Sequence, residues 1–414
     1  MRIAIIGSGL SGLTAAYRLG QHHHISLYER HPRLGMAAHG LSFGGARVDI
    51  PLRVIYPAYY PSLLALYADA GIATTPTDYS ACFCDVEGQS YFRYQNWRPL
   101  PQVSLPLVPA GDLLSKPGRH IATDLGRLLL THHRTSQLPS ADVALQDYLT
   151  ERGYSSGFCE QFLYPSFAAI HTCDLQHIRQ APAREVIDYL RRGILHSPVH
   201  RTVCGADTVV QTLSQKLHSL HLDSRVSEVE ATAEGVQLRH EDGSAEDFDH
   251  VILATPAPVS AALLTKRHSA ERQLLQQFEY VNSRVVVHKD ANLMPQKSRD
   301  WSSVNFRADR QGQRPMATIW LNRVLPVQTQ AENVFQSWNP LCEPRRIEAE
   351  AEFPRPLINT RSSKAIASLQ AAMRQSPSQR RLWFCGSYAA RGVPLLESAC
   401  ASAEAIAQHL LSPQ

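Results

Sequence analysis

The sequence predicts an α/β fold, and three of its stretches carry that prediction. A short β-branched apolar run at 3–6 leads through glycines into a stretch with helical apolar spacing at 13–19. Similar strand-like runs at 249–256 and 382–387 each end in a turn of small residues. Such runs are typical of buried parallel strands, which need helices to cover both faces of their sheet.

Composition limits the class of protein. The chain has 414 residues, 44% of them hydrophobic and 19% charged, which suits a globular protein with a large core. A net charge of +4 is too small and too evenly spread to indicate nucleic-acid binding. Since no apolar run reaches about 18 residues, we expect no transmembrane segment, and the N-terminus does not resemble a signal peptide.

The cysteines are informative about compartment and metals. The eight cysteines form neither a Cys-x-x-Cys pair nor a spaced metal-ligand set. Because disulfides persist mainly in oxidising compartments, we expect reduced, mostly buried cysteines and a cytoplasmic protein. The sequence predicts no metal site.

The N-terminal glycines match the phosphate-binding pattern Gly-x-Gly-x-x-Gly, with a strand before them and a helix after them. Gly7 allows the tight turn, Gly9 lets the backbone approach a pyrophosphate, and Gly12 lets helix and strand pack closely. A second strand at 25–28 ends in Glu29, 22 residues after Gly7, where a carboxylate can accept hydrogen bonds from ribose hydroxyls. The pattern predicts a Rossmann dinucleotide site and disfavours a 2′-phosphate. Its predicted ligand residues are Gly7, Ser8, Gly9, Leu10, Ser11, Gly12 and Glu29.

The residues after this acid indicate which dinucleotide is bound. Glu29, Arg33 and Gly35 match in register the pattern E-x-x-x-R-x-G-G-R of the flavin-containing amine oxidase superfamily, which the chain resembles. The resemblance implies FAD as the cofactor. Met36 and Ala37 replace the second glycine and the final arginine, at positions that run close under the flavin and its diphosphate in that superfamily, and this implies an altered path there. The resemblance adds the predicted cofactor residues Arg30, Arg33, Leu34, Gly35 and Met36.

Two later stretches resemble other parts of the superfamily's FAD domain. The strand at 249–256 resembles the segment that returns from the substrate region. The strand at 382–387, followed by a helix at 394–411, resembles the unit that lies along the flavin. A third strand, around Val226, stands where the superfamily contacts adenine. These stretches add Val226, Ala254, Thr255, Pro256, Gly386, Ser387 and Val393 to the predicted cofactor residues.

These pieces lie at both ends and in the middle of the chain, as the resemblance implies for a Rossmann-type FAD-binding domain built from discontinuous segments. We predict that domain at 1–53, 203–259 and 360–414, and an α+β substrate-binding domain with a mixed sheet and a helical cap at 54–202 and 260–359. In the substrate domain we expect helices at 61–71, 118–133, 143–152, 157–168 and 184–195, strands at 81–93, 283–291 and 316–324, and a proline-rich loop at 97–109.

One predicted helix allows two interpretations. The segment 118–134 carries leucines on one side and arginines and histidines elsewhere. Such a helix packs its apolar side on the core, or it docks on a membrane surface or an acidic carrier protein. Both interpretations stay open in the sequence.

A narrower resemblance rests on "FLYPSFAAIHT" at 162–172, "FEYVNSRVVVHKDANLMP" at 278–295 and "WFCGSY" at 383–388. These segments are similar to bacterial amine-oxidase-like flavoproteins that are often encoded beside cyclopropane-fatty-acid synthase-like methyltransferases. The resemblance implies a flavin-dependent oxidoreductase, acyl or lipid-like substrates for some members, and a methyltransferase as a pathway partner.

The chain departs from that subgroup where its active site is expected. Pro51 replaces a flexible glycine, Leu52 a phenylalanine and Tyr56 a short amide, and Arg53 is new. These changes imply a different substrate or reaction. They also leave open a flavin-binding, catalytically altered partner protein of a biosynthetic or lipid-modifying enzyme.

A flavin oxidase needs little from its protein beyond placing the donor carbon of its substrate at flavin N5 and managing one proton. We predict hydride transfer to flavin N5 from a largely apolar small-molecule or acyl-bearing substrate, by amine oxidation or by C–C desaturation. An NAD-linked dehydrogenase is a further alternative, although no second Gly-x-Gly-x-x-Gly is present. Lys289 is a candidate because many amine oxidases use a lysine to hold a water at N5. The candidate catalytic residues are His39, Tyr56, His171, His288 and Lys289, with Tyr388 as a further lining residue.

Overall fold

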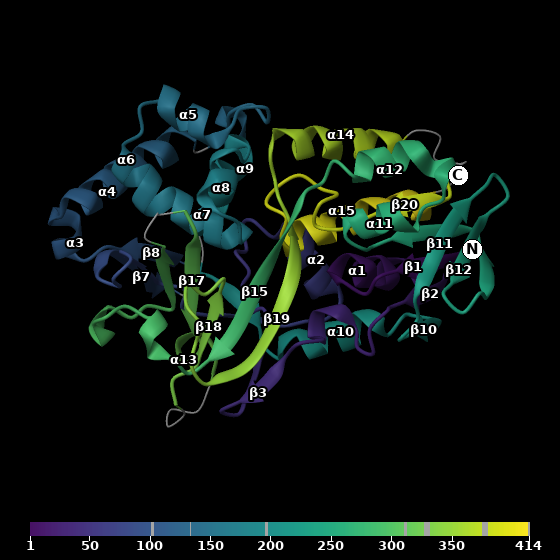
Figure 1. The fold of residues 1–414 in the computed structure, drawn as a ribbon, viewed down its shortest axis with the longest axis horizontal. Helices are drawn as coiled ribbons and strands as arrows, with labels where there is room; N and C mark the ends of the chain where they lie inside the picture. The colour runs from purple at the N-terminus through teal and green to yellow at the C-terminus, as the bar shows by residue number, and fades with distance from the viewer. Residues whose placement is uncertain are drawn as a thin grey trace.

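The computed structural model describes residues 1–100, 103–132, 134–194, 198–309, 313–326, 332–374 and 380–412. Two large sheets, one of five strands and one of eight, organise the chain. Figure 1 shows them side by side, with both termini near the five-stranded sheet and a group of helices above the eight-stranded sheet. The predicted α/β fold is confirmed.

The five-stranded sheet has the order β10-β2-β1-β14-β20, and all its neighbouring strands are parallel. In the central strand, Ile5 pairs with Leu27 on one side and with Ile252 on the other. The sheet therefore joins segments that are far apart in the sequence. Its strands are β1 (Arg2–Ile6), β2 (His24–Tyr28), β10 (Ser219–His221), β14 (His250–Leu253) and β20 (Leu382–Phe384).

Helices cover both faces of this sheet. Because successive side chains of a strand point to opposite faces, Ile5 packs against one layer and Ala4 and Ile6 against the other. This explains why the strands are apolar throughout. The first layer holds α1 (Leu10–Leu19), α10 (Gly205–Ser214) and α15 (Leu396–Leu411). The second holds α11 (Ala257–Leu263), α12 (Ser269–Leu275), α14 (Thr360–Arg374) and a small sheet of β11 (Val226–Ala231), β12 (Val236–His240) and β13 (Ala245–Phe248).

The eight-stranded sheet has the order β19-β15-β18-β17-β16-β6-β7-β8. Its β16–β6 pair is parallel and its other pairs are antiparallel, so the predicted mixed sheet is present. Its strands are β6 (Ala81–Cys84), β7 (Ser90–Leu100), β8 (Val103–Leu107), β15 (Tyr280–His288), β16 (Val304–Ala308), β17 (Pro315–Trp320), β18 (Phe335–Trp338) and β19 (Ile347–Pro356).

The predicted loop at 97–109 is wrong, because β7 and β8 form an antiparallel hairpin across much of it. Pro106 lies opposite Asn96 in β8, which is the edge strand of the sheet. Proline has no N–H to donate and is tolerated at an edge, where no further strand needs that donor. The prolines therefore mark an edge strand here.

The predicted helices form. One of them is interrupted by a π-helical turn at Cys159–Leu163, and another ends in a π-helical turn at Leu190–Ile194. The first precedes Pro165, whose missing N–H breaks the regular hydrogen-bond ladder. The predicted ends at His133 and Leu195 lie outside the described residues. The helices that correspond to predicted ones are α2 (Pro61–Asp69), α4 (Lys116–Thr131), α5 (Leu145–Glu151), α6 (Ser156–Phe158), α7 (Tyr164–His171) and α9 (Ala183–Tyr189). Two further short helices, α3 (Ala110–Leu114) and α8 (Leu175–Arg179), were not predicted.

The remaining regular elements are short. They are β3 (Leu41–Phe43), β4 (Ala46–Val48), β5 (Thr74–Pro76), β9 (His200–Thr202) and α13 (Leu321–Val324). In α4, Ile121 and Leu128 are buried in the main core, whereas Leu130 is exposed. Among the described residues, no helix is both long and apolar enough to cross a membrane.

Candidate cofactor and substrate site

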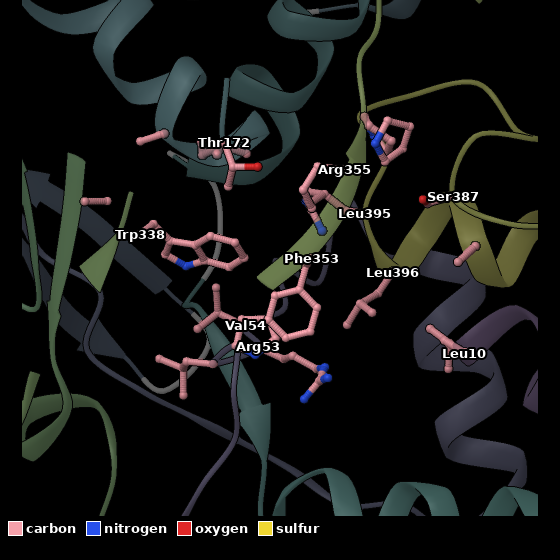
Figure 2. Close-up of a pocket in the computed structure, with 18 of the residues that line it drawn as sticks. Leu10, Arg53, Val54, Thr172, Trp338, Phe353, Arg355, Ser387, Leu395 and Leu396 are labelled. Atoms are coloured by element: carbon pink, nitrogen blue, oxygen red, sulfur yellow. The ribbon is translucent and has the colours of Figure 1, made fainter. Parts of the chain in front are cut away.

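A cavity of about 470 Å³ is lined by residues from both large sheets and their helices. Figure 2 shows Leu10 at one end and Trp338 at the other, with Arg53 and Arg355 between them. The two ends differ in construction, since one is formed by backbone turns and the other by aromatic side chains.

The first end lies at the carboxyl edge of the five-stranded sheet. Because all five strands are parallel, the turns that follow β1, β14 and β20 meet at this edge. Ligands of open α/β sheets bind at such edges. The predicted cofactor residues that line the cavity are Gly9, Leu10, Ser11, Gly35, Met36, Ala254, Thr255, Pro256, Gly386 and Ser387.

The three glycines of the loop have different constraints. Gly7 has a φ of +101°, which favours glycine. A Cβ on Gly12 would lie 2.0 Å from the carbonyl oxygen of Gly7, so only glycine allows this helix to pack so closely. A Cβ on Gly9 would meet no protein atom within 4 Å. The space beside Gly9 is therefore left open for a ligand.

Glu29 is fixed beside this loop. Its Oε2 accepts hydrogen bonds from Ser8 N at 3.0 Å and Ser8 Oγ at 2.5 Å, and its Oε1 accepts one from His31 N. Ser8 Oγ in turn accepts a hydrogen bond from Gly35 N at 2.8 Å. The network joins the glycine loop to the segment that carries Gly35. A carboxylate retains lone pairs for ribose hydroxyls after these bonds.

Two helices begin at the cavity wall. The N-cap residue of α1 is Gly9, which has no side chain, and the first turn of α1 contains no acidic residue. Leu395 and Leu396 at the start of α15 also line the cavity, and no side chain caps that helix. The first N–H groups of a helix lack partners within the helix and carry partial positive charge. These two helix ends, the open cradle at Gly9 and the Glu29 carboxylate fit a dinucleotide with its diphosphate.

The second end of the cavity is aromatic. The Tyr56 ring packs edge-on against Tyr189 at 5.7 Å and against Tyr79 at 6.4 Å. Burial raises the pKa of all three phenols, so they stay neutral hydrogen-bond donors at physiological pH. Other aromatic residues in this wall are Tyr60, Tyr94, Phe162, Phe306, Trp338 and Phe353.

The charged side chains in the described lining are Arg53 and Arg355, and the described lining contains no aspartate or glutamate. Arg53 donates from Nη2 to the Met36 carbonyl oxygen at 2.8 Å, and its Nη1 lies 3.9 Å from Asp49 Oδ2. Burial lowers the pKa of both guanidinium groups, which nevertheless remain protonated. The cavity is thus apolar and positively charged.

Two of the predicted catalytic or lining residues, Tyr56 and Tyr388, reach the cavity. His171 is 2% exposed and lies behind the wall, between the lining residues Ile170 and Thr172. Burial lowers the pKa of His171 to about 3, and its Nε2 has no hydrogen-bond partner among the described residues. His171 is therefore a neutral second layer of the aromatic end.

The other three catalytic candidates lie outside the cavity lining. His39 is exposed and packs edge-on against Phe353 at 5.5 Å. His288 is buried in the sheet, where its Nε2 is 2.8 Å from Ser337 Oγ, and burial lowers its pKa to about 4. Lys289 forms ion pairs at 3.0 and 3.1 Å with two glutamates. These positions do not bring the three residues into contact with a ligand in the cavity.

Several predicted cofactor residues also lie outside the lining. Gly7, Ser8, Gly12 and Glu29 shape the loop from behind, as described above. Val393 is buried, and its N–H donates to Tyr59 Oη at 2.9 Å. The other predicted cofactor residues that do not line the cavity are Arg30, Arg33, Leu34 and Val226.

Arg355 is a cavity residue that the sequence does not indicate. This arginine follows Phe353 by two residues in β19, so the two side chains share a face of the strand. Three exposed glutamates precede Arg355 in this strand, so the sequence gives little indication that the arginine faces a cavity. The position of β19 beside the cavity is what distinguishes Arg355.

The fold and the cavity define a dinucleotide-dependent protein with an apolar substrate pocket. The family model for flavin-containing amine oxidoreductases matches residues 10–293, which is more than half of the chain. The chain therefore belongs to this family. Its members bind FAD and act as oxidoreductases, and the predicted cofactor and enzyme class are confirmed.

Solved structures agree with this fold. A CLA-producing fatty acid isomerase from P. acnes has a TM-score of 0.71 at 12% identity and covers 99% of each chain. A protein from Exiguobacterium sp. 255-15 that is assigned as a protoporphyrinogen oxidase has a TM-score of 0.70 at 16% identity and covers 99% of this chain and 98% of its own. Cyclohexylamine oxidase from Brevibacterium oxydans has a TM-score of 0.65 at 13% identity over 99% of each chain. Among curated proteins, no sequence matches.

The departures from the superfamily pattern meet in space. Arg53 binds the carbonyl oxygen of Met36, the residue that precedes Ala37. Ala37 stands where the pattern has its final arginine. A guanidinium group therefore lies close to the position that lacks one in the sequence, although it comes from a later segment of the chain.

Proposed function

We propose that the enzyme uses FAD to oxidise a largely apolar substrate that binds at the aromatic end of the cavity. The observation that carries this proposal is the continuity of one cavity from the glycine loop to a wall of tyrosine, phenylalanine and tryptophan side chains. FAD, when bound, supplies a hydride acceptor. The protein positions the substrate and excludes water.

We propose that the cofactor binds at the glycine end of the cavity and the substrate at the aromatic end. Gly9, Ser11 and the start of α15 hold the cofactor, with Glu29 as the acceptor for ribose hydroxyls. Tyr56 faces the substrate as a neutral donor, and it is the catalytic candidate with direct access to the cavity. His39, His171, His288 and Lys289 stay candidates for indirect roles, since none lines the cavity.

The domain division at 1–53, 203–259 and 360–414 against 54–202 and 260–359 remains part of the proposal. All strands of the five-stranded sheet lie in the first set of segments, and all strands of the eight-stranded sheet lie in the second. The helix α12 belongs to the predicted substrate segments but packs against α11 and α14 beside the five-stranded sheet, so we assign it to the FAD-binding domain.

Location and partners are proposals as well. A cytoplasmic location is supported by eight free cysteines. The exposed Leu130 on α4 supports a peripheral contact with a membrane or a carrier protein. The methyltransferase partner rests on resemblance alone, and copurification from the native host would test it.

The reaction is either oxidation of a C–N bond or desaturation or isomerisation at C–C bonds. Structural neighbours described as a cyclohexylamine oxidase and a fatty acid isomerase represent these two chemistries. The test is the visible spectrum of the purified protein, followed by anaerobic titration with apolar amines and with acyl substrates. Bleaching of the flavin bands by amines assigns oxidation at C–N, and bleaching by acyl substrates assigns desaturation. Isomerisation returns the hydride to the substrate and leaves the flavin oxidised, so analysis of the acyl product detects it.

The same titration distinguishes an active oxidoreductase from a flavin-binding protein that has lost or changed its activity. A protein that binds FAD but is reduced by neither class of substrate, and that copurifies with a biosynthetic enzyme, would be the catalytically altered partner protein. A protein that takes up no FAD would contradict the proposal entirely.

A further inference from the structure

The charge of the cavity does not favour an amine substrate. Two guanidinium groups face the cavity, and the described lining contributes no carboxylate. An ammonium group entering such a space would lose its hydration and meet two like charges. An anion would be attracted by the same groups.

The two arginines differ in how they are compensated. Arg53 is bound to the Met36 carbonyl oxygen and lies near the Asp49 carboxylate. Arg355 has no carboxylate within 4.0 Å among the described residues, and its buried Nε has no hydrogen-bond partner there. Its Cζ lies 5.8 Å from the Trp338 ring. Arg355 is thus the less compensated cation.

A neighbouring strand shows the usual arrangement. Arg284 on β15 forms an ion pair with Glu343 at 2.7 Å and a second one with Glu350, and all three side chains reach solvent. Arg355 on β19 turns toward the apolar cavity without such partners. A partly buried, uncompensated cation costs free energy, which a protein recovers when a ligand supplies the opposite charge.

We propose that Arg355 binds the carboxylate group of the substrate, so that the enzyme acts on an apolar organic acid. A planar guanidinium donates two parallel hydrogen bonds to a carboxylate and suits this geometry better than an ammonium group does. The inference rests on the proposed function and adds the class of substrate. Phe353, on the same face of β19, and Trp338 supply the apolar surface beside the charge.

The anion is a substrate group and not the diphosphate of the cofactor. Gly9, which offers the open cradle for a diphosphate, lies on the α1 side of the cavity. Arg355 packs near Trp338 and His171, at the aromatic end. Of the two arginines, Arg53 is the one linked to the segment that carries Gly35 and Met36.

The test uses the FAD-loaded enzyme and three eight-carbon probes that differ in their head group: octanoate, octanamide and octylamine. Binding is measured by calorimetry, which needs no turnover. Octanoate is expected to bind at least about 10-fold more tightly than either other probe, as a charge-assisted hydrogen-bond pair allows. R355M should remove that preference and leave octanamide binding unchanged, and R355K should restore part of it. R284M removes a positive charge outside the cavity and should change none of the affinities.

Thermal unfolding of the ligand-free variants gives a second readout. Loss of this uncompensated, partly buried cation should leave the Tm of R355M unchanged or raised, whereas loss of a structural arginine would lower it. Tightest binding of octylamine, or an equal loss of all three affinities in R355M, would overturn the proposal. FAD content and anaerobic reduction are measured separately, so failure of the proposed function is recognised independently of the head-group preference.

Discussion

The two ends of the cavity are built by different means. At the glycine end, backbone groups of a few adjacent residues provide the site, and Glu29 supports them through Ser8. At the aromatic end, the lining side chains come from strands and helices that are spread along the sequence from Tyr56 to Arg355. The glycine end therefore tolerates few substitutions, because its groups come from one short segment. The second end can change its ligand by exchanging single side chains.

The sharpest test of this comparison uses two glycines of the same loop. Gly12→Ala places a Cβ 2.0 Å from a backbone oxygen, so it should lower both Tm and FAD affinity. Gly9→Val meets no protein atom at its Cβ within 4 Å, and should leave Tm almost unchanged. It should still weaken FAD binding by about 100-fold or more because the side chain occupies the cradle that the pyrophosphate requires.

Thermal unfolding and flavin fluorescence measure the two effects. Equal losses of Tm in both variants would show that the Gly9 cradle is part of the packed structure. Unchanged FAD affinity in Gly9→Val would show that the cofactor does not approach this loop.

This contrast also explains what the sequence could predict. The glycine loop was predictable because its strand, turn and helix are contiguous, and each glycine has its own steric reason. Arg355 was not, because one arginine in a strand with three glutamates resembles an ordinary solvated charge. His288 and Lys289 were chosen because they end an apolar strand. The structure places both outside the cavity lining, His288 buried against Ser337 and Lys289 in an ion pair with Glu332.

The second prediction concerns pH at the aromatic end. The pKa of His171 is lowered to about 3 by burial, whereas an unfolded histidine titrates near 6.5. The unfolded state therefore binds a proton that the folded state excludes, and stability falls as pH drops below 6.5. This histidine alone should lower the free energy of unfolding by about 2 kcal/mol between pH 6.5 and about pH 5.

Urea unfolding of the wild type and His171→Leu at several pH values measures this contribution. His250 and His288 also have pKa values lowered to about 4, so the wild type should lose more stability than one histidine explains. The variant should show a flatter pH dependence. Identical slopes for the two proteins would mean that His171 is accessible to protons in the folded state.

The third prediction separates the roles of the two arginines. Arg53 lies beside Met36 on the cofactor side, so Arg53→Met should weaken FAD binding by about 10-fold through loss of a charge-assisted contact. Arg355→Met should leave FAD affinity unchanged. Fluorescence titration of the apoprotein with FAD measures both. If Arg53→Met weakened octanoate binding and left FAD affinity unchanged, the assignment of Arg53 to the cofactor would be contradicted.

The smallest effect is expected at Tyr56. Tyr56→Phe keeps the ring that packs against Tyr79 and Tyr189, and removes only a phenol whose raised pKa keeps it neutral. No hydrogen bond from that phenol to another described residue is recorded, so its donor is free for a ligand. Loss of one neutral hydrogen bond should weaken octanoate binding by about 3- to 10-fold with little change in Tm. A large fall in Tm would instead place Tyr56 in the structural core. An unchanged affinity together with an unchanged Tm would mean that the aromatic end binds its ligand by apolar contact and the Arg355 charge alone.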